Sequence, residues 1–173
     1  MQISLPTDAE LSADALAALK TVPPLNVFRM VARAPASLEP FIHLARSILG
    51  GAQLDAKLRE LAVLRVTHLA GSAYAFQQHV VLGKALGLRD AQITAVVADG
   101  PVTELDEAGN LACQVADEIT LEVRLSDETL AQIVEGFGER RATELILACS
   151  YFNMVARFLE STRVPVDVIG AAS

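Results

Sequence analysis

The segment from residue 55 to residue 70 constrains the fold more than any other part of the chain. Asp55 is a suitable N-cap for a helix, and the apolar residues that follow point in almost every direction around the helix axis. A helix that is apolar all round has to be buried among other elements. We therefore predict a central, buried helix with apolar positions at Leu58, Leu61, Ala62, Leu64, Val66 and Leu69.

A second helix is predicted directly after the central one. Ala70, Gly71 and Ser72 provide a tight turn, and residues 72–86 again have helical periodicity before Gly87 ends the helix. Residues 58–87 are therefore predicted to form a helical hairpin around which the rest of the chain is organised.

The remaining segments also have helical rather than alternating periodicity. Ser37 is the predicted cap of the third helix, which places Pro40 in its first turn. We find no confident strand, no tandem repeat and no glycine-rich phosphate loop. The chain is predicted to be all-α, with further helices over residues 8–20, 26–34, 37–49, 89–98, 104–123, 126–136 and 139–161.

Hydrophobic residues make up 52% of the 173-residue chain, which is more than most soluble domains contain. Wide apolar helix faces have to be buried somewhere, so we predict homo-oligomerisation. A compact monomer with alanine-rich helix contacts is the alternative.

The charge pattern excludes several classes of partner. The net charge is −7, from 14 Lys and Arg against 21 Asp and Glu, and the basic residues form no cluster. Nucleic acid and anionic membrane surfaces are therefore not expected as partners. No segment is long and apolar enough to span a membrane, and the N-terminus lacks the basic and apolar regions of a signal peptide. We expect a cytoplasmic protein.

Glu60 and His79 are the main candidates for chemistry. Glu60 lies 11 residues before Gly71, and His79 lies 7 residues after Ser72. These spacings correspond to roughly 16 and 10 Å along the two helix axes, so the side chains can meet across a hairpin. A Glu–His pair can take a proton from one atom and return it to another. A buried pair that only fixes helix packing is the alternative.

Other polar residues of the hairpin are candidates for binding. Ser72 lies at a helix N-terminus, where free N–H groups favour an anion, and it shares a helix face with Ala75 and His79. His68 is turned roughly 80° away from Glu60 and is a poorer partner for it than His79. His43 lies off the apolar stripe of its helix and is expected at the surface.

Metal, hydrolytic and thiol chemistry have weaker support. The chain contains no HxxxH or HExxH spacing for a metal and no GxSxG nucleophile elbow. Cys113 and Cys149 lie in different predicted helices among apolar residues. We expect both to be buried, reduced thiols, with a disulfide or a reactive thiol as the alternative.

Several short pieces of the chain carry a family resemblance. They are REL at 59–61, LRV at 64–66, Tyr74, His79-Val80 and Gly87-Leu88, with FRMVARAP at 28–35 and YFNMVARFLEST at 151–162 on the flanks. In this order they resemble the core of the carboxymuconolactone decarboxylase family, which includes the alkyl hydroperoxidase D branch. The resemblance covers residues 25–165, so that residues 1–24 form an N-terminal helical extension and residues 166–173 a tail. It implies an alkyl hydroperoxidase D-like helical bundle that assembles as a trimer or hexamer.

Two absent cysteines indicate which branch the chain resembles. In the peroxidase branch a C-x-x-C motif opens the second helix, but Ser72 and Ala75 stand at these positions here, while the Glu and His of that branch match Glu60 and His79. A thiolate is the nucleophile in peroxide reduction, and Ser and Ala cannot form a sulfenic acid. Thiol peroxidase activity is therefore not expected.

The decarboxylase branch lacks the cysteine pair, and resemblance to it implies a lyase that uses no metal or organic cofactor. The implied substrate is a small carboxylated molecule such as an aromatic-catabolite lactone. Glu60 and His79 are then the catalytic pair, and Ser72, Tyr74 and His68 bind the substrate. Two alternatives stay open: a redox protein that has kept the scaffold without the thiols, and a non-catalytic helical oligomer that binds a small ligand.

Overall fold

The computed structural model describes residues 1–167, and within this range it consists of helices and connecting segments without any strand. The all-α prediction is therefore confirmed. The helices are α1 (Ala13–Leu19), α2 (Asn26–Val31), α3 (Pro35–Gly50), α4 (Ala56–Leu69), α5 (Ala73–Ala85), α6 (Asp90–Ala95), α7 (Glu107–Asp117), α8 (Asp127–Phe137) and α9 (Glu139–Thr162), with a 3-10 turn η1 (Asp8–Glu10) and a π-helical turn η2 (Glu118–Glu122).

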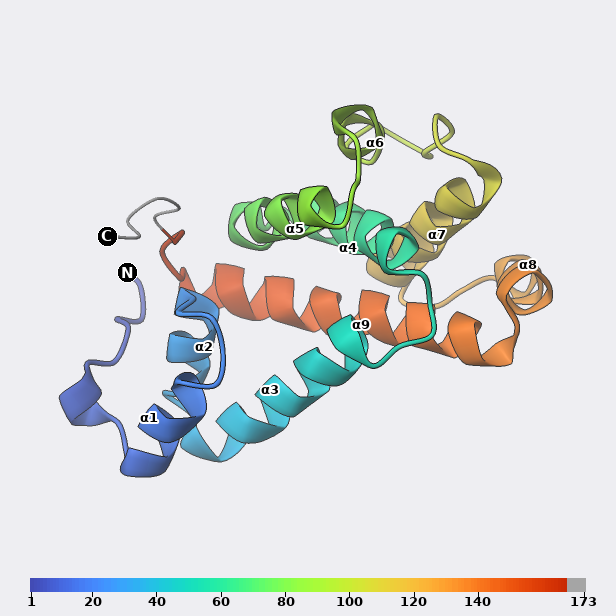
Figure 1. Cartoon of the computed structure of the whole chain (residues 1–173). Helices are drawn as coiled ribbons and strands as arrows, with labels where there is room; N and C mark the ends of the chain where they lie inside the picture. Colours follow the sequence, from blue (N-terminus) through green and yellow to red (C-terminus); the bar gives the residue numbers. More distant parts are fainter. Residues whose placement is uncertain (168–173) are drawn as a thin grey trace.

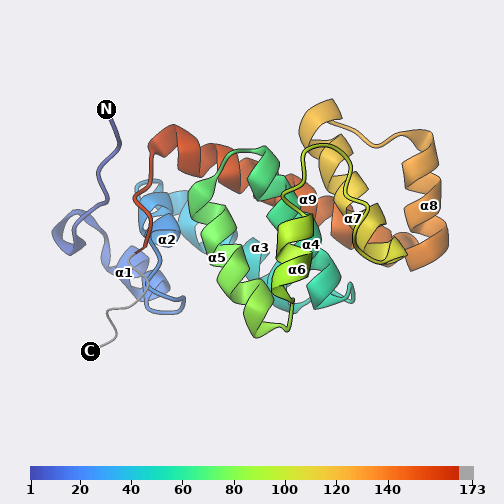
Figure 2. The same cartoon turned by 90° about the horizontal axis from the view of Figure 1, so that it is seen from above.

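Helix α4 lies at the centre of the molecule, as its all-round apolar pattern predicts. Every residue from Arg59 to Thr67 is buried, because α5, α7 and α9 all pack against this helix (Figures 1 and 2). Each fully buried Leu or Val side chain contributes about 1.5–3 kcal/mol relative to an exposed one. The central helix is therefore a rigid platform for its polar residues.

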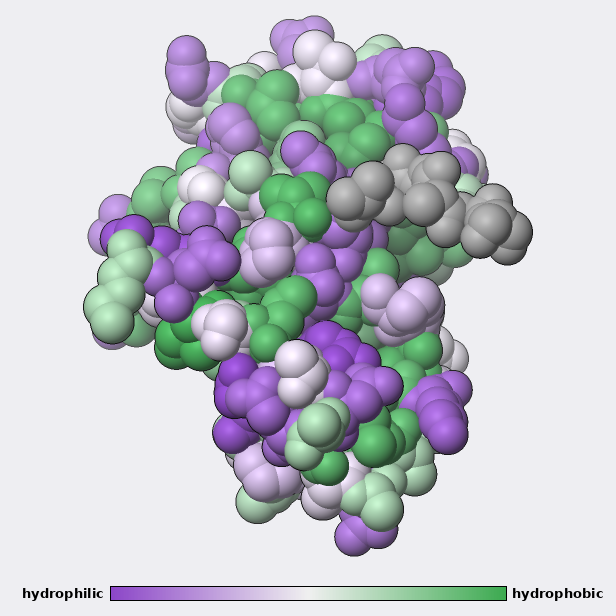
Figure 3. Space-filling model, turned by 90° about the vertical axis from the view of Figure 1, so that its left-hand side faces the viewer, coloured by the Kyte–Doolittle hydropathy of each residue, from purple (hydrophilic) through white to green (hydrophobic). Residues whose placement is uncertain are grey.

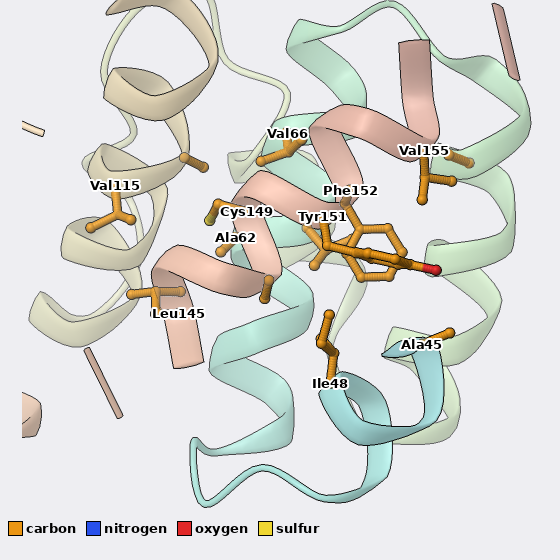
Figure 4. Packing of buried hydrophobic residues seen from close by; sticks show 14 of the residues in the cluster. Ala45, Ile48, Ala62, Val66, Val115, Leu145, Cys149, Tyr151, Phe152 and Val155 are labelled. Atoms are coloured by element: carbon orange, nitrogen blue, oxygen red, sulfur yellow. The ribbon is translucent and has the colours of Figure 1, made fainter. Parts of the chain in front are cut away.

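Helix α9 is the second organising element, because it runs along the molecule and contacts α3, α4, α5, α7 and α8 (Figure 1). Its buried face contains Leu145, Cys149 and Phe152, which join the largest hydrophobic cluster. Figure 4 shows Cys149 beside Ala62 of α4, whereas the ring of Tyr151 extends toward the side where Ala45 and Val155 lie.

A smaller hydrophobic cluster forms the end of the molecule where the N-terminal residues and the end of α9 lie (Figure 1). Ala15 and Ala18 of α1 pack there with residues of α2 and α3. The backbone N–H of Ile3 donates a hydrogen bond to the carbonyl of Thr162 at 3.2 Å. The helix α1 lies within the segment that the sequence assigns to the N-terminal extension. Of the predicted tail, Val166 and Asp167 are described, and residues 168–173 lie outside the described range.

Arg65 connects the central helix to the segment between α6 and α7. Its guanidinium is 2% exposed and pairs with Asp117, with Nε 2.5 Å from Oδ1. It also donates to the carbonyls of Val96, Ala98 and Gly100 at 3.1, 2.8 and 2.6 Å. One buried side chain therefore ties this segment to α4, in addition to the hydrophobic cluster that Val96 and Val102 form with residues of that helix.

Two helix boundaries differ from the sequence prediction. Helix α3 begins at Pro35, because proline at the first helical position loses no hydrogen bond; the position before the helix is Ala34, so Ser37 is not the cap. Residues 8–20 are not one helix, because the Ser12 hydroxyl accepts from the backbone N–H of Ala15 and starts α1 anew.

The predicted helix over residues 104–123 is also shorter than expected. Asp106 accepts from the backbone N–H of Gly109 and sets the start of α7. The π-helical turn η2 follows α7 directly. It ends before Val123, whose φ of 71° lies in the left-handed region. Within residues 1–167, no helix combines the length and the apolar character that crossing a membrane requires.

Candidate active site

Glu60 and His79 meet across the hairpin of α4 and α5. The Nδ1 atom of His79 lies 2.7 Å from Oε2 of Glu60. The Glu60 side chain is completely buried, and that of His79 is 9% exposed. The pairing expected from the spacing of these residues is therefore present, at a distance typical of a charge-assisted hydrogen bond.

Arg59 compensates the buried carboxylate from the other side. Its Nε atom lies 3.3 Å from Oε1 of Glu60, and its side chain is 4% exposed. Burying a carboxylate without a partner is costly, whereas a cation and a hydrogen bond offset that cost. Arg65, the other arginine of α4, binds Asp117 instead.

The hydrogen bond to Glu60 fixes the tautomer of His79. A neutral imidazole next to an ionised carboxylate donates from Nδ1, which leaves the lone pair on Nε2. Nε2 has no hydrogen-bond partner among the described residues and is not a fully buried atom. His79 also lines a cavity. The free nitrogen is therefore available to a molecule in that cavity.

The cavity beside His79 has a volume of about 670 Å³. Its walls come from α3, α5, α9 and the segment between Thr21 and Phe28, and they are almost entirely apolar. The ring of Phe152 packs edge to face against His79, with 4.4 Å between the ring centroids. The row continues from Phe152 to Tyr151 and from Tyr151 to Phe41, with centroid separations of 5.1 and 5.6 Å. Arg46 is the single Lys, Arg, Asp or Glu among the lining residues. The volume and lining suit a hydrophobic molecule.

Tyr74 lines the cavity, but its hydroxyl is already engaged. It accepts from the backbone N–H of Val27 at 3.1 Å and donates to Oδ2 of Asp167. Burial, followed by the hydrogen bond to the Asp167 carboxylate, raises the pKa of Tyr74. The tyrosine that we expected to bind a carboxylate therefore binds one that belongs to its own chain.

Ser72 and His68 are not brought to the cavity. Neither residue is among the cavity-lining residues. His68 is exposed and lies against Phe76, with a ring separation of 6.3 Å. Ser72 is 1% exposed at the start of α5, and its hydroxyl neither caps the helix nor bonds to any other described residue. Neither side chain therefore lines the cavity or hydrogen-bonds to Glu60 or His79. His43 is exposed, as predicted.

The unpartnered hydroxyl of Ser72 leads to a prediction about stability. Ser72→Ala is expected to stabilise the protein by about 1 kcal/mol, because it removes a buried polar group without removing a hydrogen bond. The matched control is Ser126→Ala, at an N-cap whose hydroxyl accepts from the backbone N–H of Thr129 and whose loss is expected to cost about 1 kcal/mol. Urea unfolding measures both values. Equal destabilisation by the two variants would contradict this account.

The two cysteines are free and completely buried, as expected from the sequence. Burial, together with the nearby Asp117 carboxylate, raises the pKa of Cys113 to about 12, and burial also raises the pKa of Cys149. Neither thiol is therefore a thiolate near neutral pH.

We expect neither thiol to react with a thiol-specific chromogenic disulfide at pH 8 in the native state, while both react in urea. An exposed thiol ionises near pH 9.0, so the unfolded state loses these protons first and stability falls as pH rises from there toward 12. Rapid titration of either thiol in the folded protein would contradict the assignment.

A larger groove of about 1250 Å³ lies between α7 and α8 and is lined by Glu107, Asp117 and Glu135 among other residues. It contains no histidine and no cysteine. Within the described part of the chain, no three metal-ligating side chains converge. The smaller cavity is therefore the better candidate site, because it alone adjoins a buried Glu–His pair.

Comparison with solved structures places the fold in a known class. The chain superposes on a peroxidase-related protein from Silicibacter sp. TM1040 with a TM-score of 0.82 and 18% identity, covering 96% of this chain and 92% of the other. A peroxidase-related protein from Ralstonia eutropha JMP134, described as an alkylhydroperoxidase AhpD core, gives a TM-score of 0.80, 15% identity and coverages of 96% and 92%.

A third match is an Agrobacterium tumefaciens protein of unknown function, described as a putative antioxidant defence protein AhpD, with a TM-score of 0.72, 17% identity and coverages of 80% and 96%. No curated protein matches the sequence. Residues 35–118 match the model of the Carboxymuconolactone decarboxylase family. The predicted alkyl hydroperoxidase D-like, all-α fold and the predicted resemblance to this family are confirmed, whereas the branch and the oligomer stay predictions.

Several residues of the site were not found from the sequence. Gln78 lies on the same face of α5 as Tyr74, at the i+4 position, so helical periodicity alone marks it as a candidate. Phe152 and Asp167 come from segments far along the chain, and no sequence signal links either of them to His79. Both were placed by the packing of α9 against α5.

Proposed function

We propose that this protein is a cofactor-independent enzyme that moves protons to and from carbon, with carbon–carbon lyase activity as its specific form. The observation that carries the proposal is the 2.7 Å bond between buried Glu60 and His79 at the wall of an apolar cavity. A carboxylate that orients an imidazole in this way is a common arrangement for general acid–base catalysis.

The proposed chemistry assigns one role to each group. In decarboxylation, the bond between the substrate carbon and its carboxylate breaks, CO₂ leaves, and the electron pair stays on the substrate as an enolate. His79, neutral at rest, first takes a proton from water at Nε2 and then delivers it to that carbon, and the hydroxide left behind combines with CO₂ as bicarbonate. Glu60 stabilises the imidazolium that exists before the transfer, and the apolar walls exclude water from the enolate.

The alternative of a redox protein has less support in this chain. Ser72 and Ala75 cannot act as redox thiols, and the raised pKa values of Cys113 and Cys149 make both thiols poor nucleophiles. The apolar lining of the cavity also suits a non-catalytic ligand-binding protein, and a turnover measurement distinguishes this from an enzyme.

Exchange of solvent deuterium tests the proposal without knowledge of the natural substrate. We incubate the protein in deuterium oxide with two neutral carbon acids, γ-phenyl-β,γ-butenolide and β-tetralone, and follow the loss of their acidic C–H signals by NMR. For the butenolide, His79 takes the α-proton to form a dienolate and returns a deuteron at the α- or γ-carbon. Exchange of both compounds at the buffer rate would count against the proposal.

We further propose that the chain self-associates, because α9 exposes two large apolar side chains on one face. Leu147 and Met154 are 44% and 47% exposed and lie seven residues apart. A trimer or hexamer, as the family resemblance implies, would bury them. Light scattering after gel filtration measures the state, and a monomer at micromolar concentration would contradict this expectation.

A further inference from the structure

Asp167 is held against the cavity wall by three hydrogen-bond donors. Its Oδ1 atom accepts from the backbone N–H of Asn26 at 2.9 Å. Its Oδ2 atom accepts from the side-chain amide of Gln78 at 3.1 Å and from the hydroxyl of Tyr74. Both carboxylate oxygens are therefore satisfied, and two of the three donors are side chains that line the cavity beside His79.

The three donors are neutral. No Lys or Arg forms an ion pair with Asp167 within residues 1–167. A set of neutral donors can hold one carboxylate through charge-assisted hydrogen bonds, but it does not trap that carboxylate as a buried ion pair would. Asp167 is also only partly buried and follows the end of α9 by five residues. Displacing this carboxylate therefore breaks three hydrogen bonds but no ion pair with Lys or Arg.

We propose that Tyr74, Gln78 and the Asn26 N–H form a carboxylate-binding subsite of the cavity, and that Asp167 fills it when no substrate is bound. The substrate class is an amphiphilic monocarboxylate: a hydrophobic, preferably aromatic body in the cavity and one carboxylate that displaces Asp167. This inference rests on the proposed function, because it assigns the substrate of the same cavity that contains His79.

The lining of the cavity limits the ligand to one negative charge. Arg46 is the sole Lys or Arg on the walls, it is exposed, and its guanidinium is bound to the carbonyl of Thr21. A second carboxylate would therefore be desolvated without a partner, which is costly. By contrast, the aromatic row of Phe41, Tyr151 and Phe152 provides faces and edges for a ring system.

The hydrophobic body is accommodated at the end of the molecule where α1, α2 and the end of α9 lie. Figure 3 views this end and shows hydrophobic residues between hydrophilic ones on its surface. The cavity has room for a molecule well beyond the size of a simple dicarboxylic acid. A small, doubly charged lactone therefore fits the site less well than a larger amphiphile.

Calorimetry with a matched pair of ligands tests the subsite. The pair is β-naphthylacetate and its methyl ester, which share the same ring system and differ in charge. In the Asp167→Ala variant, we expect the affinity for the acid to rise about tenfold, because the competing carboxylate is gone and each hydrogen bond to a charged group is worth that much or more. The affinity for the ester stays within twofold.

A second substitution and a control make the test specific. Adding Tyr74→Phe to Asp167→Ala is expected to reverse the gain for the acid and to leave the ester unchanged. Asp99→Ala removes the same charge from an exposed residue outside the cavity and is expected to change neither affinity. The affinity for muconate, a dicarboxylate, is expected to rise less in Asp167→Ala than the affinity for β-naphthylacetate.

Three results would overturn the subsite. The first is an unchanged or weaker affinity for the acid in Asp167→Ala, which means that Asp167 has only a structural role. The second is an equal gain for the ester, which means that the variant simply opens the cavity. The third is a larger gain for muconate. If the acid binds as expected while deuterium exchange is absent, the proton-transfer function fails and the subsite stands.

Discussion

His79→Asn is expected to lower the rate of solvent-deuterium exchange by about 10²- to 10⁴-fold, the usual contribution of a positioned general base. The Asn amide can still donate to Glu60 in place of Nδ1, so the buried carboxylate keeps a partner, while the lone pair of Nε2 is lost. The far-ultraviolet circular dichroism and the urea midpoint are expected to change little. This variant therefore separates the proton-transfer role of His79 from its packing role.

Glu60→Gln is expected to produce a loss of the same order for a different reason. A neutral amide that donates to Nδ1 favours the tautomer with the proton on Nε2, and this tautomer has no base facing the cavity. The double variant Glu60→Gln/His79→Asn is expected to exchange deuterium only a little more slowly than either single variant. The reason is that both substitutions remove the same function, the base at Nε2. Removing the charge also leaves Arg59 without its buried partner, which destabilises the fold by up to about 3–5 kcal/mol.

His68→Asn is the matched control for His79, because it makes the same substitution on the adjoining helix at an exposed position. Its exchange rate is expected to equal that of the wild type. If His79→Asn and Glu60→Gln both retain the wild-type rate, the pair has only a structural role. A loss in His68→Asn as large as in His79→Asn would show that the chemistry lies elsewhere.

Arg65→Met is expected to destabilise the protein by about 3–5 kcal/mol. The substitution preserves most of the side-chain volume but removes the ion pair with Asp117 and all the hydrogen bonds to the carbonyls of Val96, Ala98 and Gly100. Those acceptors then have no partner in a largely buried place. Urea unfolding followed by circular dichroism measures the loss.

Arg140→Met is the corresponding control at the surface. Arg140 is 64% exposed and pairs with Glu144 at i+4, so its loss is expected to cost about 0.3–0.5 kcal/mol. If Arg65→Met costs no more than Arg140→Met, the loop between α6 and α7 does not depend on Arg65. Hydrogen exchange of the amides in residues 96–100 shows whether this loop opens first.

The sequence was sufficient for the fold where one rule dominated. The all-round apolar pattern of α4 required burial on every side, and the glycine at position 71 required a turn, with a φ of 66° in the structure. Boundaries were less predictable because competing caps decide them. Pro35 and Ser12 each start a helix where periodicity alone would continue or delay one.

The site was predictable only within the hairpin. Glu60 and His79 are joined by helix geometry alone, so the spacing was enough to expect their contact. For Ser72 and His68 the spacing gave proximity along the chain without direction, and neither residue lines the cavity. Asp167 reaches Tyr74 across 93 residues, and this contact depends on the tertiary packing of α9, which no local pattern encodes.

The central claim is that Glu60 holds the Nδ1 proton of His79 while Nε2 faces a ligand in the cavity. Nitrogen-15 NMR of the imidazoles tests it directly, because the chain has three histidines and the exposed His43 and His68 can be removed to assign the third. When the neutral methyl β-naphthylacetate is added, the account predicts that the Nε2 resonance of His79 shifts and that Nδ1 stays protonated. An Nε2 resonance that does not shift when the ligand is added would contradict the account. So would a neutral imidazole whose proton is on Nε2 and not on Nδ1.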